Sequence, residues 1–332
     1  MPKISIIVAA YNVEKYICRC LNSLVNQTLD NIEIIVVNDG STDDTLNKIK
    51  EFVQDHRVKI IDKKNGGLIE ARKSGLNVTT GEYVQFVDGD DWLRQDACEI
   101  LYKKAVAENL DIVYFNLNYV YGDEVILNST LQFDLLIGQK YLDMVLRNEI
   151  RANIVLQLIK KSFIKNNNIE IPGGITYAED LLITVILASY NPRVSMIGEG
   201  LYYYYQRDGS ITRMITNRVF DVEKVINLIG IILEKNKFQY KYSEQFDYLS
   251  YMHLYFYRII EAEYIEKLHY ELYCMWKKRN IDIKRNVYYK NHYNKLSFKT
   301  KIKLKAYNIS FTLGKYLTNS IYTIKNKTRK VR

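Results

Sequence analysis

Three carboxylates follow one largely apolar run of the sequence at close spacing. Tyr83–Val87 leads directly into Asp88, Gly89, Asp90 and Asp91. Carboxylates two residues apart with glycine between them can approach a divalent cation without steric conflict. Hard oxygen ligands suit Mg²⁺ or Mn²⁺, which commonly lies between one or two carboxylates and substrate phosphates. The pattern therefore indicates a metal site, and a solvated acidic turn is the alternative interpretation of the same residues.

Two further polar clusters could contact a nucleotide. Asp39 follows the apolar run Ile32–Val37, and its carboxylate could accept hydrogen bonds from a nucleobase. Arg72 lies one turn into a helical pattern that follows Asn65-Gly-Gly, and it could reach a phosphate or a base edge. Each cluster could equally be a turn followed by a helix, so neither is specific by itself.

Alternating strands and helices must position these clusters. Short apolar runs alternate with helical spacing through the first 115 residues, and strands are expected at Ile4–Ala10, Ile32–Val37, Val58–Ile61, Tyr83–Val87 and Ile112–Phe115. This alternation predicts an α/β fold with a mostly parallel sheet covered on both faces. Ligands of such sheets bind outside the carboxyl ends of the strands. The polar clusters that follow the first four strands should therefore meet at one edge, which is the expected active site.

Four segments within the first 92 residues together resemble the signature blocks of family 2 glycosyltransferases. They are Ser5–Asn12, Val37–Asp43, Asn65–Arg72 and Phe86–Trp92, and they occur in the family's order. The resemblance implies the GT-A fold, a Rossmann-like, mostly parallel sheet flanked by helices. Helical spacing of apolar residues from Asn217 onward predicts a helical C-terminal region after it. The resemblance also implies an inverting transferase that uses a nucleotide-diphosphate sugar, usually UDP-linked, and that builds bacterial cell-surface glycans such as capsule, cell-wall or adhesin glycans.

The resemblance assigns roles to individual residues. Asp90 would ligate the Mn²⁺ or Mg²⁺ that bridges the diphosphate, and Asp39 with the Ala9–Asn12 backbone would hold uracil. Asp88 would lie along the ribose and the sugar. The residues implied to bind the nucleotide sugar are Ala9, Tyr11, Asn12, Asp39, Asn65, Arg72, Asp88, Gly89 and Arg207.

Two later segments resemble the family less closely. Tyr177–Leu182 is similar to the family's Glu-Asp block, which would make Asp180 the catalytic base. Without the resemblance, Glu179-Asp180 could equally be the first turn of a helix, where the helix dipole favours acidic residues. In the Tyr-rich segment Leu201–Thr212, Tyr205 stands where the family often has an arginine, and Arg207 is the candidate replacement for contacting the diphosphate.

The positive charge of the chain is concentrated near its C-terminal end. The net charge is +9, from 47 Lys and Arg against 38 Asp and Glu. Positions 276–332 hold 17 basic residues and one acid, which leaves 30 basic and 37 acidic residues elsewhere. Apolar residues in this segment recur every three or four positions, which is typical of a basic amphipathic helix: Phe298, Ile302, Ala306, Ile309, Leu313, Leu317, Ile321 and Ile324. Such a helix could lie on an anionic membrane or dock on the rest of the protein.

These patterns predict two domains and a cytoplasmic protein. A nucleotide-sugar-binding and catalytic domain is expected over 1–215, and a helical, Tyr-rich region over 216–332, with the basic tail from about 295. The four cysteines form no CxxC pair and the histidines are scattered, so neither disulfides nor a zinc cluster is indicated. No apolar run approaches the ~20 residues of a membrane span. The enzyme is therefore expected in the cytoplasm, with peripheral attachment to the inner face of the membrane as an option.

The expected partners are a UDP-sugar donor and a glycan or lipid-linked glycan acceptor. An oligomer is compatible with the sequence, and no nucleic acid is expected because nothing in the basic tail resembles a nucleic-acid module. A nucleotidyltransferase is a less favoured alternative, because it would typically carry a glycine-rich basic loop where Ala9–Asn12 stands. A non-catalytic, nucleotide-sugar-binding partner subunit is the other alternative, and the intact Asp39, Asp88, Asp90 and Asp180 argue against it.

Overall fold

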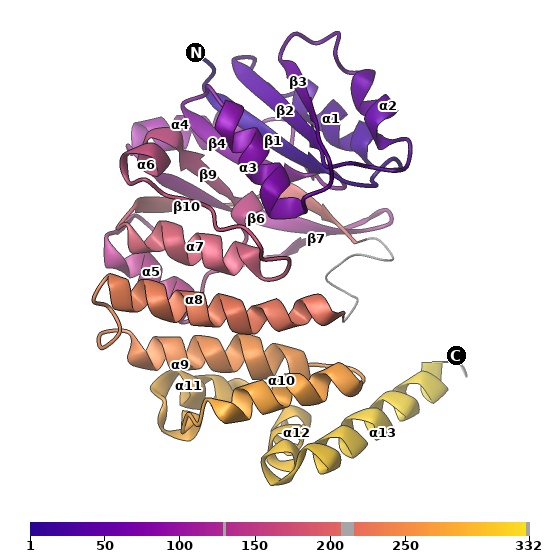
Figure 1. Ribbon diagram of the computed structural model, residues 1–332, viewed down its shortest axis with the longest axis vertical. Coiled ribbons are helices and arrows are strands. Elements are labelled where there is room, and N and C mark those ends of the chain that lie inside the picture. The colour runs from indigo at the N-terminus through magenta and orange to yellow at the C-terminus, as the bar shows by residue number, and fades with distance from the viewer. Residues whose placement is uncertain (129–130, 207–215, 330–332) are drawn as a thin grey trace. The chain divides into compact units, whose positions relative to one another are not determined.

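The computed structural model describes residues 1–128, 131–206 and 216–329, and the chain forms two compact units (Figure 1). The sheet unit comprises Met1–Leu142 and Ala152–Met214. The helical unit comprises Asp143–Arg151 and Ile215–Arg332. No helix among the described residues has both the length and the apolar composition needed to cross a bilayer.

The first half of the sheet is entirely parallel, in the order β3-β2-β1-β4. Its strands are β1 (Ile4–Ala10), β2 (Ile32–Asn38), β3 (Val58–Asp62) and β4 (Tyr83–Asp88), and they alternate with the helices α1 (Ile17–Val25), α2 (Thr45–Lys50) and α3 (Leu68–Val78). Every residue of β1 and β2 is buried, as expected for parallel strands covered on both faces. The predicted strands are present, and the predicted α/β fold class is confirmed.

The second half of the sheet begins with a strand that the sequence did not indicate. β9 (Gln157–Lys160) lies antiparallel between β4 and β6 (Ile112–Tyr121), and β10 (Arg193–Tyr205) is parallel to β6. The end of β10 pairs with the short strand β5 (Trp92–Leu93), with Tyr203 opposite Trp92. This pairing brings the Tyr-rich segment next to the acidic turn after β4. The remaining elements of this unit are α4 (Ala97–Ala107), β7 (Glu124–Asn128), β8 (Leu136–Ile137), α6 (Lys161–Asn166) and α7 (Glu179–Ser189), while α5 (Gln139–Leu146) has residues in both units.

Helix α3 packs directly on β1 and β2 because Gly75 carries no side chain (Figure 1). A Cβ at Gly75 would lie 2.4 Å from Cγ2 of Ile7 and 3.3 Å from Cγ2 of Val37. Arg72 lies one turn earlier on this helix. The close approach at Gly75 therefore fixes the position of Arg72 relative to the strands.

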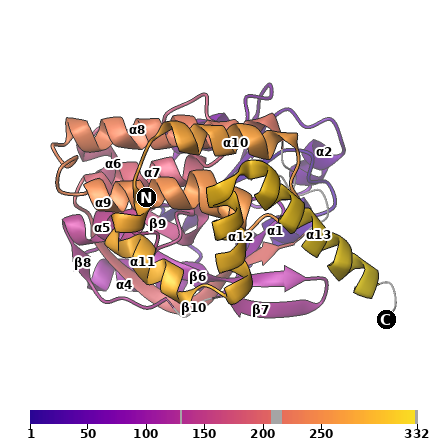
Figure 2. The same cartoon turned by 90° about the horizontal axis from the view of Figure 1, so that it is seen from below.

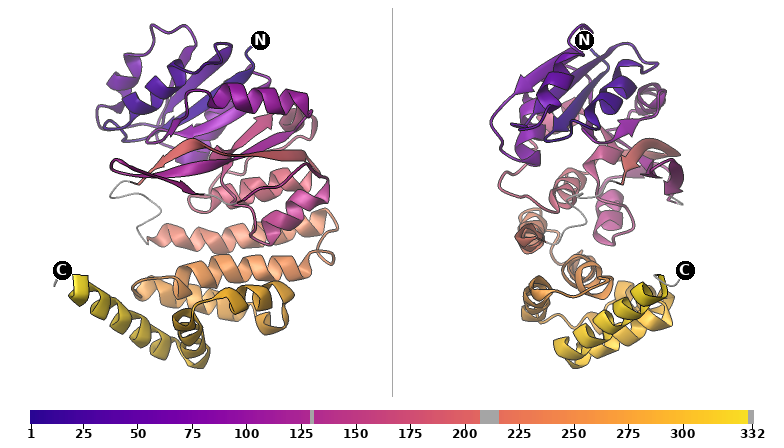
Figure 3. Two further views of the ribbon diagram at one scale, coloured as in Figure 1. Left: turned by 180° about the vertical axis from the view of Figure 1, so that it is seen from behind. Right: turned by 90° about the vertical axis from the view of Figure 1, so that its right-hand side faces the viewer.

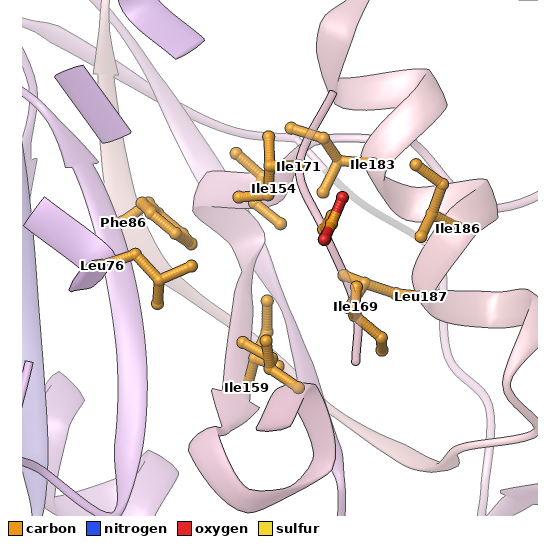
Figure 4. A pocket seen from close by; sticks show the side chains of 11 residues that line it. Leu76, Phe86, Ile154, Ile159, Ile169, Ile171, Ile183, Ile186 and Leu187 are labelled. Carbon is orange, nitrogen blue, oxygen red and sulfur yellow. The ribbon is translucent and has the colours of Figure 1, made fainter. Parts of the chain in front are cut away.

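Helix α7 is held by an apolar layer that contains a small cavity of about 10 Å³ (Figure 4). Ile183, Ile186 and Leu187 of α7 line it together with Leu76 of α3 and Phe86 of β4. A cavity of this size could hold one water molecule at most, and its lining lacks the several polar partners that a buried water needs. It is therefore a packing feature that anchors α7, and not a ligand site.

The second unit consists of helices, which Figures 2 and 3 show from further sides, and aromatic side chains fill much of its core. Its elements are α8 (Asp221–Lys235), α9 (Ser243–Tyr251) continuing as a π-helix to Ile260, α10 (Lys267–Lys278), α11 (Val287–Lys295), α12 (Phe298–Ile309) and α13 (Phe311–Arg329). The ring of Tyr251 lies 5.1–5.9 Å from those of Tyr255, Phe256, Trp276 and Tyr289. Tyrosines in this unit therefore form much of its core.

The segment Asp143–Arg151 belongs to the helical unit through specific contacts. The side-chain amide of Asn148 donates to the Tyr257 hydroxyl at 2.5 Å, and its carbonyl lies 3.2 Å from Nε2 of His253. Gln245 also donates to Asp143 at 2.9 Å. These contacts join a short stretch of chain to helices about 100 residues later.

The prediction that the apolar residues of the tail form one stripe on a single helix is wrong, because the helix is interrupted at Ser310. Ser310 has an extended backbone, with φ −159° and ψ 154°, and it separates α12 from α13. Its hydroxyl accepts a hydrogen bond from the Leu313 amide at 3.1 Å, as the residue before a helix commonly does. Of the predicted stripe, Ala306 is buried, whereas Phe298 and Ile309 are exposed.

Glu33 joins the amino ends of the four parallel strands. Its Oε1 accepts hydrogen bonds from the Ser5 hydroxyl and from the Thr80 amide, both at 2.6 Å. Its Oε2 accepts one from Nζ of Lys59 at 2.8 Å, and its Oε1 accepts a further one from the Gly81 amide at 3.1 Å. Burial alone would raise its pKa, but these hydrogen bonds lower the pKa of Glu33 to about 2.

We expect Glu33→Gln to lower the free energy of unfolding by about 2–3 kcal/mol at pH 7. The carboxylate contributes this stability above the ordinary glutamate pKa of 4.5, and the contribution is lost as the pH falls towards about 2. The difference between the two proteins in urea unfolding should therefore shrink at pH 3, and amide exchange at Thr80 and Gly81 should accelerate in the variant. Glu99→Gln, in an exposed pair with Lys103, is the control and should change little. A pH-independent difference would contradict the assignment.

Candidate active site

Hydrogen bonds connect the loops that follow the four parallel strands. The Asn12 amide donates to the Ser41 hydroxyl at 3.1 Å, and the Asn12 side-chain carbonyl accepts from the Thr42 amide at 2.8 Å. The Gly89 amide donates to the Ala9 carbonyl at 3.0 Å. The side chain of Asn12 is thus used to join two loops, while Tyr11 beside it is exposed.

Asp39 holds the loop between β3 and α3 in place. Its Oδ1 accepts from the Gly66 amide at 2.9 Å and from Nζ of Lys63 at 2.7 Å, and its Oδ2 accepts from the Gly67 amide at 2.7 Å. A carboxylate offers about four acceptor positions, so one position on Oδ2 remains. Asp39 is buried, and protein donors occupy all but one of the acceptor positions of its carboxylate.

Gly40 lets the loop after β2 approach the same loop. Its φ of +71° lies in the left-handed region, and a Cβ there would be 2.6 Å from the Asn65 backbone nitrogen. Asn65 itself is exposed. The loops that carry Asp39 and Asn65 are consequently in direct backbone contact.

Arg72, on α3, contacts carboxylates from two distant parts of the sheet unit, the end of β4 and the start of α7. Its side chain is only 2% exposed; Nη1 donates to Oδ1 of Asp180 at 2.8 Å, and Nη2 donates to Oδ1 of Asp88 at 3.0 Å. Oε1 of Glu179 lies 3.9 Å from Nη1. Burial alone would lower the pKa of Arg72, but these carboxylates raise it, so the guanidinium stays charged.

Asp180 lies in the first turn of α7. Ala178, just before the helix, has left-handed backbone angles of φ 61° and ψ 21°, which is unusual for a residue with a side chain. Burial raises the pKa of the Asp180 carboxyl to about 7, and the neighbouring Arg72 charge opposes this rise. The side chain is 22% exposed, and Oδ2 has no hydrogen-bond partner among the described residues. One oxygen is therefore fixed by Arg72, and the other is available.

Two hydrogen bonds from β10 hold the turn after β4. The Tyr202 hydroxyl donates to Oδ2 of Asp91 at 2.7 Å, and the Tyr205 amide donates to Oδ1 at 2.8 Å. Burial, together with the nearby Asp90 and Asp88 charges, raises the pKa of Asp91 well above its ordinary value. Asp91 thus anchors the turn to β10.

The carboxylates of this turn fit a cation that arrives with phosphate ligands. In the part of the chain that the structure describes, no group of three or more His, Cys, Asp or Glu side chains could hold a metal by itself. Mg²⁺ bound by one or two carboxylates completes its coordination with water and substrate phosphates. Asp90 is half-buried, and Asp88 and Asp91 lie close enough for their charges to raise the pKa of buried groups beside them. A Cβ at Gly89 would come within 3.1 Å of the Ala9 carbonyl oxygen, so glycine allows the turn to approach β1.

Arg19 is a residue of this site that the sequence did not indicate. Its guanidinium carbon lies 3.9 Å from the ring centre of Trp92 and 4.2 Å from that of Tyr205, and Nη2 donates to the Asp90 carbonyl at 3.0 Å. Cation–π contacts of this kind favour a fixed guanidinium. Arg19 thus places a positive charge beside Tyr205, where the sequence resemblance expects an arginine. Arg19 could not be found from the sequence, because no local pattern links it to residues more than 70 positions later. The predicted replacement, Arg207, lies outside the described residues.

The structure brings some predicted residues together and leaves others apart. Arg72, Asp88 and Asp180 are in direct contact, and Ala9 contacts Gly89 through backbone atoms. Asp39 and Asn65 lie in the adjoining loops, where Asp39 contacts protein groups. Asp91 and Tyr202 are further residues that support the site and that had no predicted role.

Comparisons with known proteins show which family this chain resembles. The sequence pattern of "Glycosyl transferase family 2" matches residues 5–168. Glycosyltransferase GlyA of Streptococcus pneumoniae is 36% identical over 65% of this chain, but this match covers only 32% of GlyA. The chain therefore spans about a third of the length of that relative. Putative glycosyltransferase EpsH of Bacillus subtilis is 31% identical over 76% of this chain and 75% of its own length.

A solved structure shares the fold at lower identity. S. aureus TarS 1-349 in complex with UDP-GlcNAc has a TM-score of 0.62 to this chain and 22% identity, covering 76% of this chain and 80% of that one.

We expect Arg72→Met to leave the largely buried Asp180 carboxylate and the half-buried Asp88 carboxylate without their cation. The free energy of unfolding at pH 8 should fall by about 3–5 kcal/mol, and the pKa of Asp180 should rise further above about 7. As the pH falls through that value, the carboxyl becomes neutral and its burial costs less, so the deficit measured by urea unfolding should narrow at pH 5.

Arg94→Met is the matched control, because Arg94 pairs with the more exposed Asp96 and Glu199. It should be much less destabilising at either pH. Equal deficits for the two variants at pH 8 would contradict a special role for the Arg72 cluster.

Proposed function

Because the chain belongs to glycosyl transferase family 2, we propose that it is an inverting transferase that moves a sugar from a UDP-sugar to an acceptor hydroxyl of a cell-surface glycan. The observation that carries this proposal is Asp180, a largely buried carboxyl with a pKa near 7 that is oriented by Arg72 beside the acidic turn. Bases with pKa values near the working pH are the effective ones in proton transfer.

Asp180 is proposed to take the acceptor proton. The hydroxyl oxygen attacks C1 of the sugar while Oδ2 of Asp180 accepts the hydroxyl proton, and the bond from C1 to the phosphate oxygen breaks. UDP leaves with the electron pair of that bond. Attack on the face opposite the leaving group inverts the anomeric centre. Arg72 fixes Oδ1, so that the carboxylate presents Oδ2 in a defined direction.

The strand-end loops support a uracil nucleotide as the donor. Asp39 has one acceptor position left, which matches the single N–H of uracil, whereas guanine would present several. The likeness to TarS, a protein solved with UDP-GlcNAc, supports the same choice. The base would have to enter beside the loop that Lys63 and Asp39 hold closed.

Asp90 is proposed to hold Mn²⁺ or Mg²⁺ together with the donor diphosphate. When bound, such a cation offsets the negative charge that develops on departing UDP. Arg19 fixes the carbonyl of Asp90 and thereby the backbone of the turn. Asp91 does the same from β10, through Tyr202 and the Tyr205 amide.

The acceptor is proposed to be a glycan or lipid-linked glycan that is assembled on the cytoplasmic side of the membrane. Both sequence relatives are named as glycosyltransferases of bacteria, which supports a bacterial glycan without specifying one. The two domains expected over 1–215 and 216–332 would then divide donor binding from functions of the helical region.

We expect Asp180→Asn to reduce transfer by about 10²–10⁴-fold, as the loss of a general base does. UDP affinity measured by calorimetry should stay nearly unchanged, because the amide keeps the shape of the side chain. In the unaltered protein, kcat should fall about tenfold per pH unit below about pH 7, since only the ionised carboxylate accepts a proton. Normal turnover by the variant would remove Asp180 from this role, and absence of both UDP-sugar hydrolysis and transfer in the unaltered protein would favour a non-catalytic subunit.

Asp90→Ala should abolish the part of UDP affinity that depends on Mn²⁺. Calorimetry with and without Mn²⁺ measures this difference directly, without relying on turnover. Asp123→Ala, an exposed acid in the same unit, is the control and should leave both affinities unchanged. An unaltered Mn²⁺-dependent affinity in Asp90→Ala would be evidence against the metal assignment.

A further inference from the structure

The hairpin of α12 and α13 packs through one face of each helix. On α12 this face consists of Lys303, Leu304, Ala306 and Tyr307, all buried. A Cβ at Gly314 of α13 would lie 2.3 Å from the Tyr307 ring, so the two helices are in close contact there. Nζ of Lys303 donates to the carbonyls of Ile260 and Ala262, both at 3.0 Å, which ties α12 to the end of the preceding π-helix.

The opposite face of α12 exposes large apolar side chains. Phe298 is 79% exposed and Ile309 76% exposed, and Ile302 is also exposed. Their spacing of four and seven residues places them on one side of the helix. Leu313 and Tyr316 on α13 are exposed as well. We call Phe298, Ile302 and Ile309 of α12 the hairpin apolar set.

Lysines surround the hairpin apolar set, and no acidic residue lies nearby in sequence. Lys305 is three residues after Ile302 and four before Ile309, so it lies on the same side of α12 and is exposed. Lys299 and Lys315 are exposed in the same helices. After Asp282 the sequence contains neither Asp nor Glu. The hairpin therefore combines exposed apolar side chains with an excess of positive charge, which Glu261 and Glu263 of the preceding segment offset only beside Lys299 and Lys303.

We propose that the hairpin apolar set binds the surface of an anionic phospholipid bilayer. Its apolar side chains would lie at the boundary of the acyl chains, and the lysines would lie among the phosphate headgroups. The contact would hold α12 in the plane of the membrane surface. It is independent of the proposed sugar transfer, although it would place the protein where a membrane-borne acceptor is found.

Charge and chemistry favour a bilayer over other occupants. A second copy of the chain docked symmetrically on this face would set Lys305 against the same lysine of the other copy. A nucleic acid would neutralise the lysines but would not require exposed Phe298 or Ile309. An anionic bilayer matches both properties.

Vesicle co-sedimentation of the full chain tests the proposal. The protein should bind vesicles of phosphatidylcholine with 30% phosphatidylglycerol at least tenfold more tightly than vesicles of phosphatidylcholine alone. Phe298→Ser combined with Ile309→Ser should weaken binding to the anionic vesicles at least tenfold, and Lys299→Glu combined with Lys305→Glu should do the same. Ile231→Ser combined with Tyr240→Ser removes equally exposed apolar groups elsewhere in the helical unit and should leave binding unchanged.

The possible results distinguish membrane binding from dimerisation, from nucleic-acid binding and from the proposed catalysis. Binding by the Phe298 and Ile309 variant that equals that of the unaltered protein would overturn the proposal. So would failure of the unaltered protein to bind anionic vesicles, whether it instead forms a dimer in sedimentation velocity or binds duplex DNA. UDP affinity, measured by calorimetry, should be the same for all variants, so that failure of donor binding would count against the proposed transfer and not against membrane binding.

Discussion

The buried guanidinium of Arg72 is the interaction on which the site depends. It neutralises carboxylates from the end of β4 and the start of α7, which are about 90 residues apart in sequence. Two carboxylates so close together would repel each other without it, and burying either one alone would be costly. The cation also acts on the chemistry, because it opposes the rise that burial imposes on the Asp180 pKa. One side chain thus determines both where the carboxylate lies and how readily it accepts a proton.

The two edges of the parallel sheet use buried charge in different ways. At the amino edge, Glu33 is surrounded by donors from neighbouring strands and loops, so its negative charge is fully satisfied and its pKa is low. At the carboxyl edge, Asp180 keeps one oxygen without a partner among the described residues, and its pKa is high. A satisfied carboxylate stabilises the fold, whereas a partly satisfied one can exchange a proton. The contrast follows from the number of donors that each edge supplies, and not from the type of residue.

Much of the parallel half of the sheet could be predicted because its information is local. Fully buried strands are read as continuous apolar runs, and the residues Asp39, Arg72, Asp88 and Asp90 follow them at the expected edge. The partners of these residues were not predictable in the same way. Asp39 binds the Gly66 and Gly67 amides, and Arg19 lies between aromatic rings that are contributed by β5 and the end of β10, so both depend on contacts over tens of residues. The tail shows the same limit on a smaller scale, because the apolar periodicity continues across Ser310, although the extended backbone of Ser310 separates the two helices and its hydroxyl caps the second one.

The chain passes between its two units three times, after residues 142, 151 and 214. Asp143–Arg151 is made early during synthesis, but the partners of Asn148 on the π-helix emerge about 100 residues later. The sheet unit therefore acquires its last strands, β9 and β10, while this short segment still lacks its permanent contacts. Neither unit corresponds to one uninterrupted stretch of gene, so a cut at residue 214 would separate Asn148 from Tyr257 and His253. Exchange of the helical region between related proteins would have to carry both pieces together.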